Sequence, residues 1–315
     1  MRNLLNRKNN NASLLTLPGE ERIFRWRDHV VVYSILGEGA PLLMLHGINA
    51  AAWGFEYRRN YQEFAKHYRV YVPDLPGYGR SERKPIDYTA ELYIDFARDF
   101  ASHILEVEGE APAVVVTSLS AAHVISAAAR DPQLFGPLVL ISPTGLERLD
   151  FPPSAGAKRA HRWLYGTLGS VVFALLTTRL STKIFLGRDS YFDKTGIDKE
   201  LIEGYYATGH RPNAKYAPVC FITFYLNHSV RGEWEKIAQP TLIVWGREAK
   251  ITPFKDSELF LKLRPQTELA MIKQARLSSN DERGEEFNRI VLDWLSRHYN
   301  GKKEAAVSTY PGMVK

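Results

Sequence analysis

The sequence predicts an α/β protein with a doubly wound, mostly parallel sheet and an inserted helical cap. Three observations lead to this class. Short β-branched runs alternate with helical stretches, several of these runs are apolar on consecutive residues, and one long aromatic segment breaks the alternation. Apolar residues in succession indicate strands that are buried on both faces. Strands that alternate with helices favour a parallel sheet sandwiched between helices.

The strands and helices are expected in a regular order along the chain. The strands are predicted as short buried runs at His29–Ile35, Leu42–Leu45, Arg69–Val72, Val114–Thr117, Leu138–Ile141, Thr241–Trp245 and Leu269–Ile272. The helices are predicted at Ala90–Glu106, Ala121–Arg130, Pro253–Leu263 and Glu285–Arg297. Apolar residues recur at helical spacing in the last helix and form one stripe that can pack on the sheet. The first strand alternates less clearly and is the candidate for an antiparallel edge strand.

The break in the alternation divides the chain into a discontinuous core and an insertion. The core is expected at 25–146 and 237–299, the helical cap at 147–236, and flexible tails at 1–24 and 300–315. The cap segment is rich in aromatic residues and has no clear strand pattern. A cap at this place would roof a pocket at the carboxyl ends of the strands, where open α/β sheets bind ligands. The expected partner is therefore a small apolar ligand or substrate.

The composition excludes several other classes of protein. The chain has 315 residues, of which 45% are hydrophobic and 24% charged, so disorder and coiled coil are excluded. The net charge is +6, but basic and acidic residues are interleaved over most of the length. A nucleic-acid binder is expected to cluster its basic residues with aromatics between them. No nucleic-acid partner is therefore expected, and nothing in the sequence sets the oligomeric state.

Cysteine usage and apolar runs bear on the compartment. Cys220 is the only cysteine, so no internal disulfide can form and a reducing, cytoplasmic location is expected. The longest apolar passage, Leu164–Leu176, is shorter than the roughly 20 residues that span a bilayer. It is also interrupted by glycine and serine. We therefore expect no integral membrane association and favour a buried or pocket-lining helix over a membrane-surface helix.

The most informative segment follows the predicted strand Val114–Thr117. A strand that runs through a small-x-Ser-x-small turn into a helix presents the Ser hydroxyl at the top of the sheet. Ser120 is predicted to occupy this nucleophile position, with Ser118 and Ala122 as the small residues on either side. Two alternatives remain open. Ser120 only caps its helix, or Ser118 supplies the hydroxyl instead.

A second strand supports a site at this turn. It ends in His46-Gly47, which leaves the backbone N–H of Ile48 free to face Ser120. Together with the N–H of Ala121 it would form an oxyanion hole, which stabilises negative charge on a reacting carbonyl oxygen. His46 itself is expected to have a structural role in this loop.

Taken together, these residues resemble the α/β-hydrolase fold family over about Arg25 to Tyr299. The resemblance is carried by His46-Gly47, Asp74-x-x-Gly77-x-Gly79-x-Ser81, the turn at Ser120, the run Pro240-Thr241-Leu242-Ile243-Val244-Trp245-Gly246 and the final apolar helix. It implies a cap at the place of the insertion and a triad of serine, histidine and acid. Members of the family hydrolyse esters, epoxides, lactones and halides, or catalyse related lyase and peroxidase reactions.

The sequence departs from the family at two triad positions. The position of the acid is Ala249, and the adjacent Glu248 is a doubtful substitute because neighbours in a loop point in different directions. The position of the histidine, after the last predicted strand, is Leu277. A serine hydroxyl without a base is a poor nucleophile near neutral pH. His210 and His228 in the cap are doubtful candidates to replace the base.

Three functions remain open from the sequence. The first is a serine esterase-like hydrolase for a small apolar acyl substrate, with weak or absent hydrolysis because the triad is degraded. The second is a non-catalytic protein that binds an apolar ligand or a protein partner in the same pocket. An interaction protein that uses the cap surface is a third, less specific reading. No cofactor is expected, and no metal site is expected because no His, Asp or Glu cluster has ligand spacing.

Overall fold

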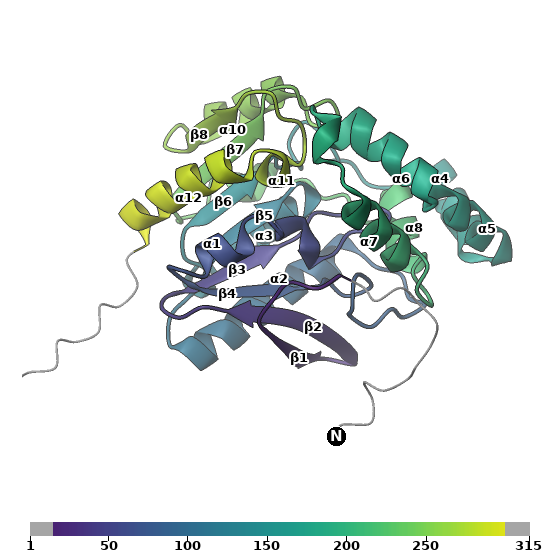
Figure 1. Ribbon diagram of the computed structural model, residues 1–315, viewed down its shortest axis with the longest axis horizontal. Coiled ribbons are helices and arrows are strands. Elements are labelled where there is room, and N and C mark those ends of the chain that lie inside the picture. Colours follow the sequence, from purple (N-terminus) through teal and green to yellow (C-terminus); the bar gives the residue numbers. More distant parts are fainter. Residues whose placement is uncertain (1–14, 300–315) are drawn as a thin grey trace, which may run out of the picture.

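The computed structural model describes residues 15–299, which are built around an eight-stranded sheet (Figure 1). The strands are β1 Glu20–Trp26, β2 His29–Leu36, β3 Pro41–Leu45, β4 Arg69–Pro73, β5 Ala113–Thr117, β6 Leu138–Ile141, β7 Thr241–Gly246 and β8 Glu268–Ile272. Their order in the sheet is β1-β2-β4-β3-β5-β6-β7-β8. Strand β2 pairs antiparallel with β1 and β4, and all other neighbours pair parallel. The predicted doubly wound, mostly parallel α/β class is confirmed.

Burial explains why the central strands are apolar on consecutive residues. Every residue of β3, β5, β6 and β7 is buried, because helices cover both faces of the sheet. Leu43 and Leu45 pack on the side of helices α2 and α3, whereas Leu42 and Met44 pack on the side of α1 and α12. The two apolar clusters hold the carboxyl ends of the strands at one edge, where the site is expected.

The helices follow the strands as the sequence pattern predicts for the core. The core helices are α1 Tyr61–Phe64, α2 Ala90–Glu108, α3 Leu119–Arg130, α10 Ser257–Leu263, α11 Ser279–Glu282 and α12 Gly284–His298, with short 3-10 turns η1 Gly54–Tyr57, η2 Pro132–Leu134 and η5 Phe254–Asp256. Helix α12 buries Phe287, Val291, Trp294 and Leu295, so the predicted stripe faces the sheet. Ile290 of that stripe is only partly buried.

The chain between β6 and β7 forms the cap helices, which lie at one side of the sheet in Figure 1. They are α4 Ala155–Tyr165, α5 Thr167–Leu176, α6 Arg179–Phe185, the π-helical turn η3 Leu186–Ser190, the 3-10 turn η4 Lys194–Gly196, α7 Lys199–Gly209, α8 Tyr216–Ile222 and α9 Arg231–Trp234. Ser154, Thr178 and Asp198 start α4, α6 and α7, because each side chain accepts a hydrogen bond from a backbone N–H of the first turn.

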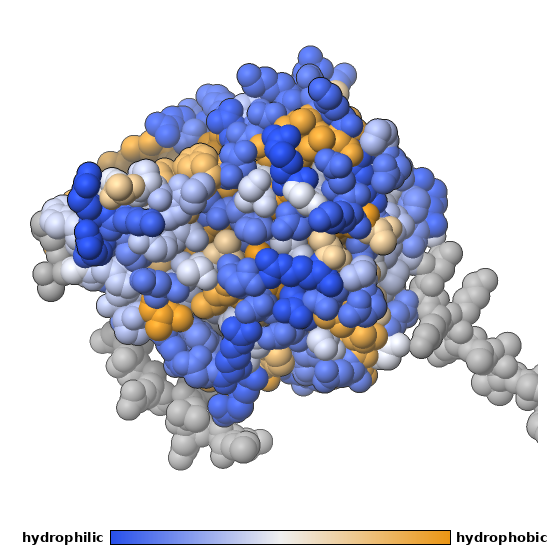
Figure 2. Space-filling view, turned by 180° about the vertical axis from the view of Figure 1, so that it is seen from behind, coloured by the Kyte–Doolittle hydropathy of each residue, from blue (hydrophilic) through white to orange (hydrophobic). Residues whose placement is uncertain are grey.

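Within the described residues no single helix has the length and apolar character needed to cross a membrane. One bent pair, Gly169–Leu176 with Arg179–Ser190, meets those two criteria when taken together. Large apolar side chains are exposed along α4 to α6, at Trp163, Val171, Leu175, Leu176, Leu180 and Ile184. The rear face of the molecule is mostly hydrophilic, and its hydrophobic residues form separate patches (Figure 2).

One strand lies where a tail was expected. Residues 20–24 belong to β1, which pairs along its full length with β2 and ends in the buried Trp26. Three of its four exposed positions carry charged residues, at Glu20, Glu21 and Arg25, which is typical of edge strands and hides the strand pattern. Strand β2 is antiparallel as predicted but is not the edge. Residues 15–19 of the expected tail precede this strand, and Leu17 among them is buried. The other expected tail residues, 1–14 and 300–315, lie outside the described residues.

Candidate functional site

The sharp turn at the end of strand β5 is centred on Ser118. The strand ends at Thr117 and helix α3 begins at Leu119. Ser118 has a φ of 55° and a ψ of −121°, a conformation that costs a non-glycine residue about 1–3 kcal/mol. Its N–H donates to the Ile141 oxygen at 2.8 Å, and its oxygen accepts from the Ala121 N–H at 3.1 Å. These bonds hold the strained turn, which presents the Ser118 side chain at the carboxyl edge of the sheet.

Ser120 lies inside the first turn of α3, beyond the sharp turn. Its side chain is buried, and its Oγ donates to the backbone oxygen of His46 at 2.7 Å. The predicted position of the turn is corrected here, because the strained residue is Ser118, two residues before Ser120. The error has a physical origin in Val116. The family pattern requires a small residue two positions before the serine. The residue two positions before Ser118 is the bulky Val116, so the pattern matched Ser120 instead. The choice of nucleophile between these two serines stays a prediction.

The predicted pair of oxyanion donors is also only partly present. The N–H of Ala121 already donates to the Ser118 oxygen at 3.1 Å, so it is not free to bind an oxyanion. The N–H of Leu119 follows the strained residue directly and has no acceptor among residues 15–299. The N–H of Ile48 likewise has no acceptor in this described range. The available donors at the turn are therefore those of Ile48 and Leu119.

His46 holds the loop that carries Ile48. Its Nε2 accepts from the Leu75 N–H at 3.0 Å, so the ring proton lies on Nδ1, which donates to the Gly47 oxygen at 2.7 Å. Burial lowers the pKa of His46, which keeps the ring neutral. Both ring nitrogens are thus occupied by backbone groups, and His46 has no nitrogen left for proton transfer to a substrate.

The buried carboxyl group of Glu56 lies against this loop. Its Oε2 accepts from the Gly47 N–H at 3.0 Å, and its Oε1 is buried with no hydrogen-bond partner in the described part of the chain. Burial raises the pKa of Glu56 to about 7, although hydrogen bonds with Thr117 and Gly47 act in the opposite direction. Glu56 therefore exchanges a proton near neutral pH, next to the residue that precedes Ser118. No motif singled it out in the sequence.

A small cavity of about 10 Å³ adjoins Glu56 and is too small for an organic substrate. It is lined by Trp53, Glu56, Tyr191, Leu201, Tyr205, Ser278 and Asp281. Asp281 is ion-paired with Arg58 at 3.0 Å and Arg59 at 3.1 Å. The cavity thus lies between the segment that follows β3, the cap and the segment that follows β8.

The two loops expected to hold the acid and the histidine lie side by side. Ala249 is buried in the turn after β7. Glu248 accepts from the Ala275 N–H at 3.1 Å through its Oε2, and its own N–H donates to the Ala275 oxygen at 3.0 Å. Leu277 is half-buried, directly before the cavity-lining Ser278. The Glu248 carboxylate is thus tied to the backbone of the loop that carries Leu277.

A family model and curated relatives agree with this geometry. The model of the alpha/beta hydrolase family matches residues 42–290. The chain belongs to the alpha/beta hydrolase family. A 2-hydroxy-6-oxononadienedioate/2-hydroxy-6-oxononatrienedioate hydrolase from Comamonas testosteroni is 28% identical over 273 residues, covering 82% of this chain and 89% of that protein. A 2-hydroxy-6-oxo-6-phenylhexa-2,4-dienoate hydrolase from Delftia acidovorans is also 28% identical, with the same two shares covered.

Solved structures show the same alpha/beta hydrolase fold. A serine hydrolase involved in carbazole degradation aligns with a TM-score of 0.74 at 21% identity, covering 88% of this chain and 99% of that chain. A thermophilic esterase from Thermogutta terrifontis aligns with a TM-score of 0.72 at 18% identity, covering 90% of this chain and all of that one. At these identities the likeness concerns the fold and not the reaction.

The two cap histidines of this alpha/beta hydrolase are engaged elsewhere. His210 is exposed at the end of α7, where Nδ1 lies 2.8 Å from the Tyr206 oxygen. The Nε2 of His228 lies 2.7 Å from the Oγ of Ser126. Ser126 follows Ser118 by about two helical turns, or roughly 12 Å along the axis of α3. Neither histidine is placed as a partner of Ser118.

A second, larger cavity of about 600 Å³ lies in the cap and is open to solvent. It is lined by cap residues alone, namely Tyr165, Gly166, Ser170, Phe173, Ala174, Gly209, His210, Arg211, Asn213, Ala214, Lys215 and Tyr216. Ser118 does not line it. Cys220 lies near this part of the cap, and burial raises the pKa of its thiol to about 11, so the sulfur is a neutral thiol and not a nucleophile.

Proposed function

We propose that this alpha/beta hydrolase family protein hydrolyses a small organic substrate, with Ser118 as the nucleophile. The observation that carries the proposal is the strained backbone of Ser118, directly before the Leu119 N–H, which like the Ile48 N–H has no acceptor among residues 15–299. Strain of this kind persists only where the surrounding structure enforces it, and it is concentrated at functional sites. The N–H groups of Ile48 and Leu119 are suited to stabilise an oxyanion that forms when Ser118 attacks a carbonyl carbon.

Glu56 is the general base in this proposal. A base is most effective when its pKa is near the working pH, and burial raises the pKa of Glu56 to about 7. Glu56 contacts Gly47, which precedes the Ile48 donor, and Thr117, which precedes Ser118. A base at this place does not require a histidine at position 277, so the substitutions at Ala249 and Leu277 are compatible with hydrolysis.

The relatives that share most of the chain support a proposal for the substrate class. Their names describe hydrolases of 2-hydroxy-6-oxo dienoates, which are small unsaturated keto acids. In the proposed reaction Ser118 adds to the ketone carbonyl while Glu56 takes its proton, so an oxyanion forms as it does in ester hydrolysis. The carbon–carbon bond then breaks, the leaving carbon takes up the proton, and water hydrolyses the acyl-serine. We assign this protein to carbonyl substrates of that size, with carbon–carbon hydrolysis ahead of ester hydrolysis.

A pair of serine variants tests the nucleophile. Hydrolysis of 2-hydroxy-6-oxo-6-phenylhexa-2,4-dienoate and of a p-nitrophenyl ester is measured for the wild type, Ser118→Ala and Ser120→Ala. We expect Ser118→Ala to lower kcat/KM by at least about 10³-fold. Ser120→Ala is the matched control and should retain activity within about tenfold while it loses about 1 kcal/mol of stability, the cost of one buried hydrogen bond. Equal rates for the wild type and Ser118→Ala would contradict the proposal and favour a binding protein.

The base is tested by Glu56→Gln, which keeps an acceptor for the Gly47 N–H but cannot take a proton. The variant should lower kcat by about 10²-fold or more. In the wild type, kcat/KM should rise as the pH increases through about 7, because the base must lose its proton. In Glu56→Gln this rise should disappear. A pH profile that is unchanged by the substitution would remove Glu56 from the mechanism and leave the role of Ser118 standing.

A further inference from the structure

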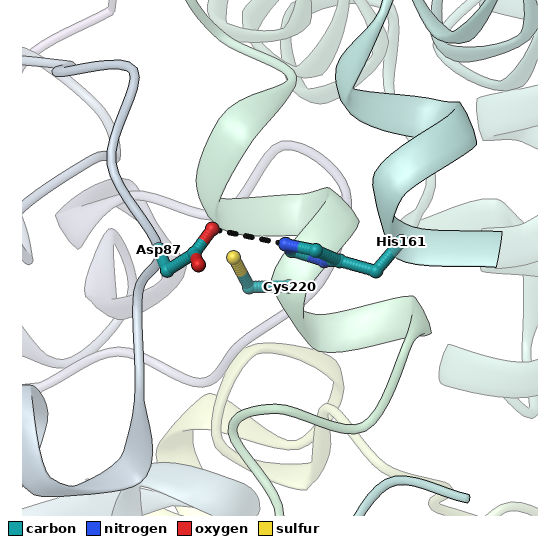
Figure 3. Close-up of side chains that lie close together, drawn as sticks. All are labelled: Asp87, His161 and Cys220. Carbon is teal, nitrogen blue, oxygen red and sulfur yellow. Dashed lines mark hydrogen bonds and ion pairs between the residues drawn. The ribbon is translucent and has the colours of Figure 1, made fainter. Parts of the chain in front are cut away.

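Three side chains that can bind a metal ion meet where cap helices contact the core. Asp87 lies in the loop before α2, His161 on α4 and Cys220 on α8. One ligand atom of each lies within 4.8 Å of the others. Their side chains point toward one another in Figure 3, where Oδ1 of Asp87 lies 3.0 Å from Nε2 of His161. Carboxylate, imidazole and thiolate are the side-chain groups that bind zinc in proteins.

The hydrogen bonds around His161 show which ring nitrogen carries a proton and which has a free lone pair. The hydroxyl of Thr223 donates to the Val219 oxygen at 2.6 Å, so its Oγ1 can only accept from the ring. Nδ1 of His161 lies 3.0 Å from this Oγ1 and therefore carries a proton. Neutral His161 then directs the bare lone pair of Nε2 at a carboxylate oxygen of Asp87. Two such atoms repel each other unless Nε2 also carries a proton, as in an ion pair, or both atoms bind a cation.

The sulfur of Cys220 completes the set on the buried side. It accepts from the Tyr88 N–H at 3.3 Å, a contact that favours negative charge on sulfur. The Tyr165 hydroxyl, 3.3 Å from the same sulfur, donates to the Ile86 oxygen, so it is turned away from sulfur as a donor. An ion pair between His161 and Asp87 would leave the sulfur without a role in the cluster. A metal ion uses all three groups.

We propose that Asp87, His161 and Cys220 form a binding site for one zinc-like divalent cation. On binding, the Cys220 thiol releases its proton to solvent and a metal–sulfur bond replaces the S–H bond. Donors around tetrahedral zinc lie about 3.3–3.8 Å apart, so the three side chains need only small rotations to share an ion. The Asp87 side chain is 61% exposed, which gives the ion a route from solvent and leaves water as the fourth ligand.

Zinc suits this donor set better than magnesium or calcium does. Thiolate and imidazole are soft or borderline ligands, whereas magnesium and calcium prefer oxygen alone. A histidine that binds a metal through one ring nitrogen usually donates a hydrogen bond from the other nitrogen, which fixes the orientation of the ring. The Thr223 hydroxyl accepts this hydrogen bond from His161. The ion would also connect α4 and α8 of the cap to the core loop before α2, so it would stabilise the contact between cap and core.

Metal titration of the full-length protein tests the site. The protein is freed of metal with a chelator, and Zn²⁺ is added in a calorimeter while Co²⁺ is added in a spectrometer. We expect one ion per chain and a thiolate-to-cobalt charge-transfer absorption. Thr223→Val keeps all three ligands and should weaken Zn²⁺ binding about 10–100-fold. Cys220→Ala and His161→Gln each remove a ligand and should weaken binding by more than that, whereas His210→Gln, an exposed cap histidine, is the matched control and should bind as the wild type does.

Three results would overturn the proposal. The first is wild-type protein that takes up no stoichiometric Zn²⁺. The second is Co²⁺ binding to the wild type without the charge-transfer absorption, which would show that sulfur is not a ligand. This measurement needs no variant, so it holds even if a variant fails to fold. The third is equal Zn²⁺ affinity in Cys220→Ala, His161→Gln and His210→Gln. None of these results bears on hydrolysis at Ser118, so this proposal and the proposed function stand or fall separately.

Discussion

At the scale of single residues, substitution of Ser118 and of Ser120 by glycine should change the free energy of unfolding in opposite directions. The φ of Ser118 is 55°, so Ser118→Gly should relieve strain and stabilise the protein by about 1 kcal/mol. Ser120 lies in a helix and donates to the His46 oxygen, so Ser120→Gly should destabilise it by about 1–2 kcal/mol. Urea unfolding of both variants measures the difference. Loss of stability in both would show that the turn at Ser118 is not strained.

A second residue-scale prediction concerns Glu56 and pH. Its pKa is about 7 in the folded protein against 4.5 in an ordinary environment, so the folded state holds its proton more tightly. The wild type should therefore lose stability as the pH rises from about 4.5 to 7, because the carboxyl group must become charged while buried. A shift of this size corresponds to about 3 kcal/mol. Glu56→Gln has no such charge, so it should exceed the wild type in stability at pH 8 more than at pH 5.

Thermal unfolding at several pH values checks this prediction. Glu63→Gln is a suitable control, because Glu63 forms an exposed pair with Lys66 and the substitution should leave the pH dependence unchanged. A constant stability difference between Glu56→Gln and the wild type across this pH range would show that Glu56 is ionised throughout.

At the scale of elements, the loops after β7 and β8 decide whether an ordinary triad can be rebuilt. Ala249→Asp alone places a carboxylate at a buried position and should destabilise the protein by about 1–3 kcal/mol. Leu277→His on the neighbouring loop should supply a partner for it. We expect the double variant to regain stability and to hydrolyse substrate even when Glu56 is replaced by glutamine. Activity of the double variant that still requires Glu56 would show that position 277 does not reach Ser118.

The elements were largely predictable from the sequence, whereas their contacts were not. Buried runs such as Leu138–Ile141 are local patterns, and the structure has that strand with the same bounds. The turn was missed by two residues, because Val116 obscured the pattern of small residues around Ser118. Glu56 and the metal-ligand cluster were invisible for another reason. Their partners are distant in sequence, such as Asp87 and His161 at 74 residues apart, so spacing along the chain contains no signal.

At the scale of the whole molecule, one ion-pair network joins the cap to the core. Arg58 lies after η1 of the core and contacts Asp198, which caps α7, at 2.7 Å and Asp281 of α11 at 3.0 Å. The side chains of Arg58 and Asp281 are 9% and 4% exposed, so each buried charge is stabilised by its partner and not by water. Asp281→Asn should therefore destabilise the protein by about 3 kcal/mol.

The matched control for this network is Asp293→Asn, which removes an exposed pair with Arg297 and should cost less than about 0.5 kcal/mol. Urea unfolding followed by tryptophan fluorescence compares the two variants. Equal and small losses would show that Arg58 retains enough partners without Asp281, and that the network does not hold the cap to the core.

The position of the cap in the chain has an evolutionary consequence. The cap leaves the core after β6 and returns at β7, and the register of all eight strands is formed by residues outside 147–236. Mutations in 147–236 can therefore alter what the molecule selects without disturbing the sheet edge that carries Ser118. Under the proposed function, substrate selection by the cap and the chemistry at Ser118 are encoded by separate stretches of one gene. Insertions, deletions or exchange of the middle stretch can then diversify ligands while the turn is inherited unchanged.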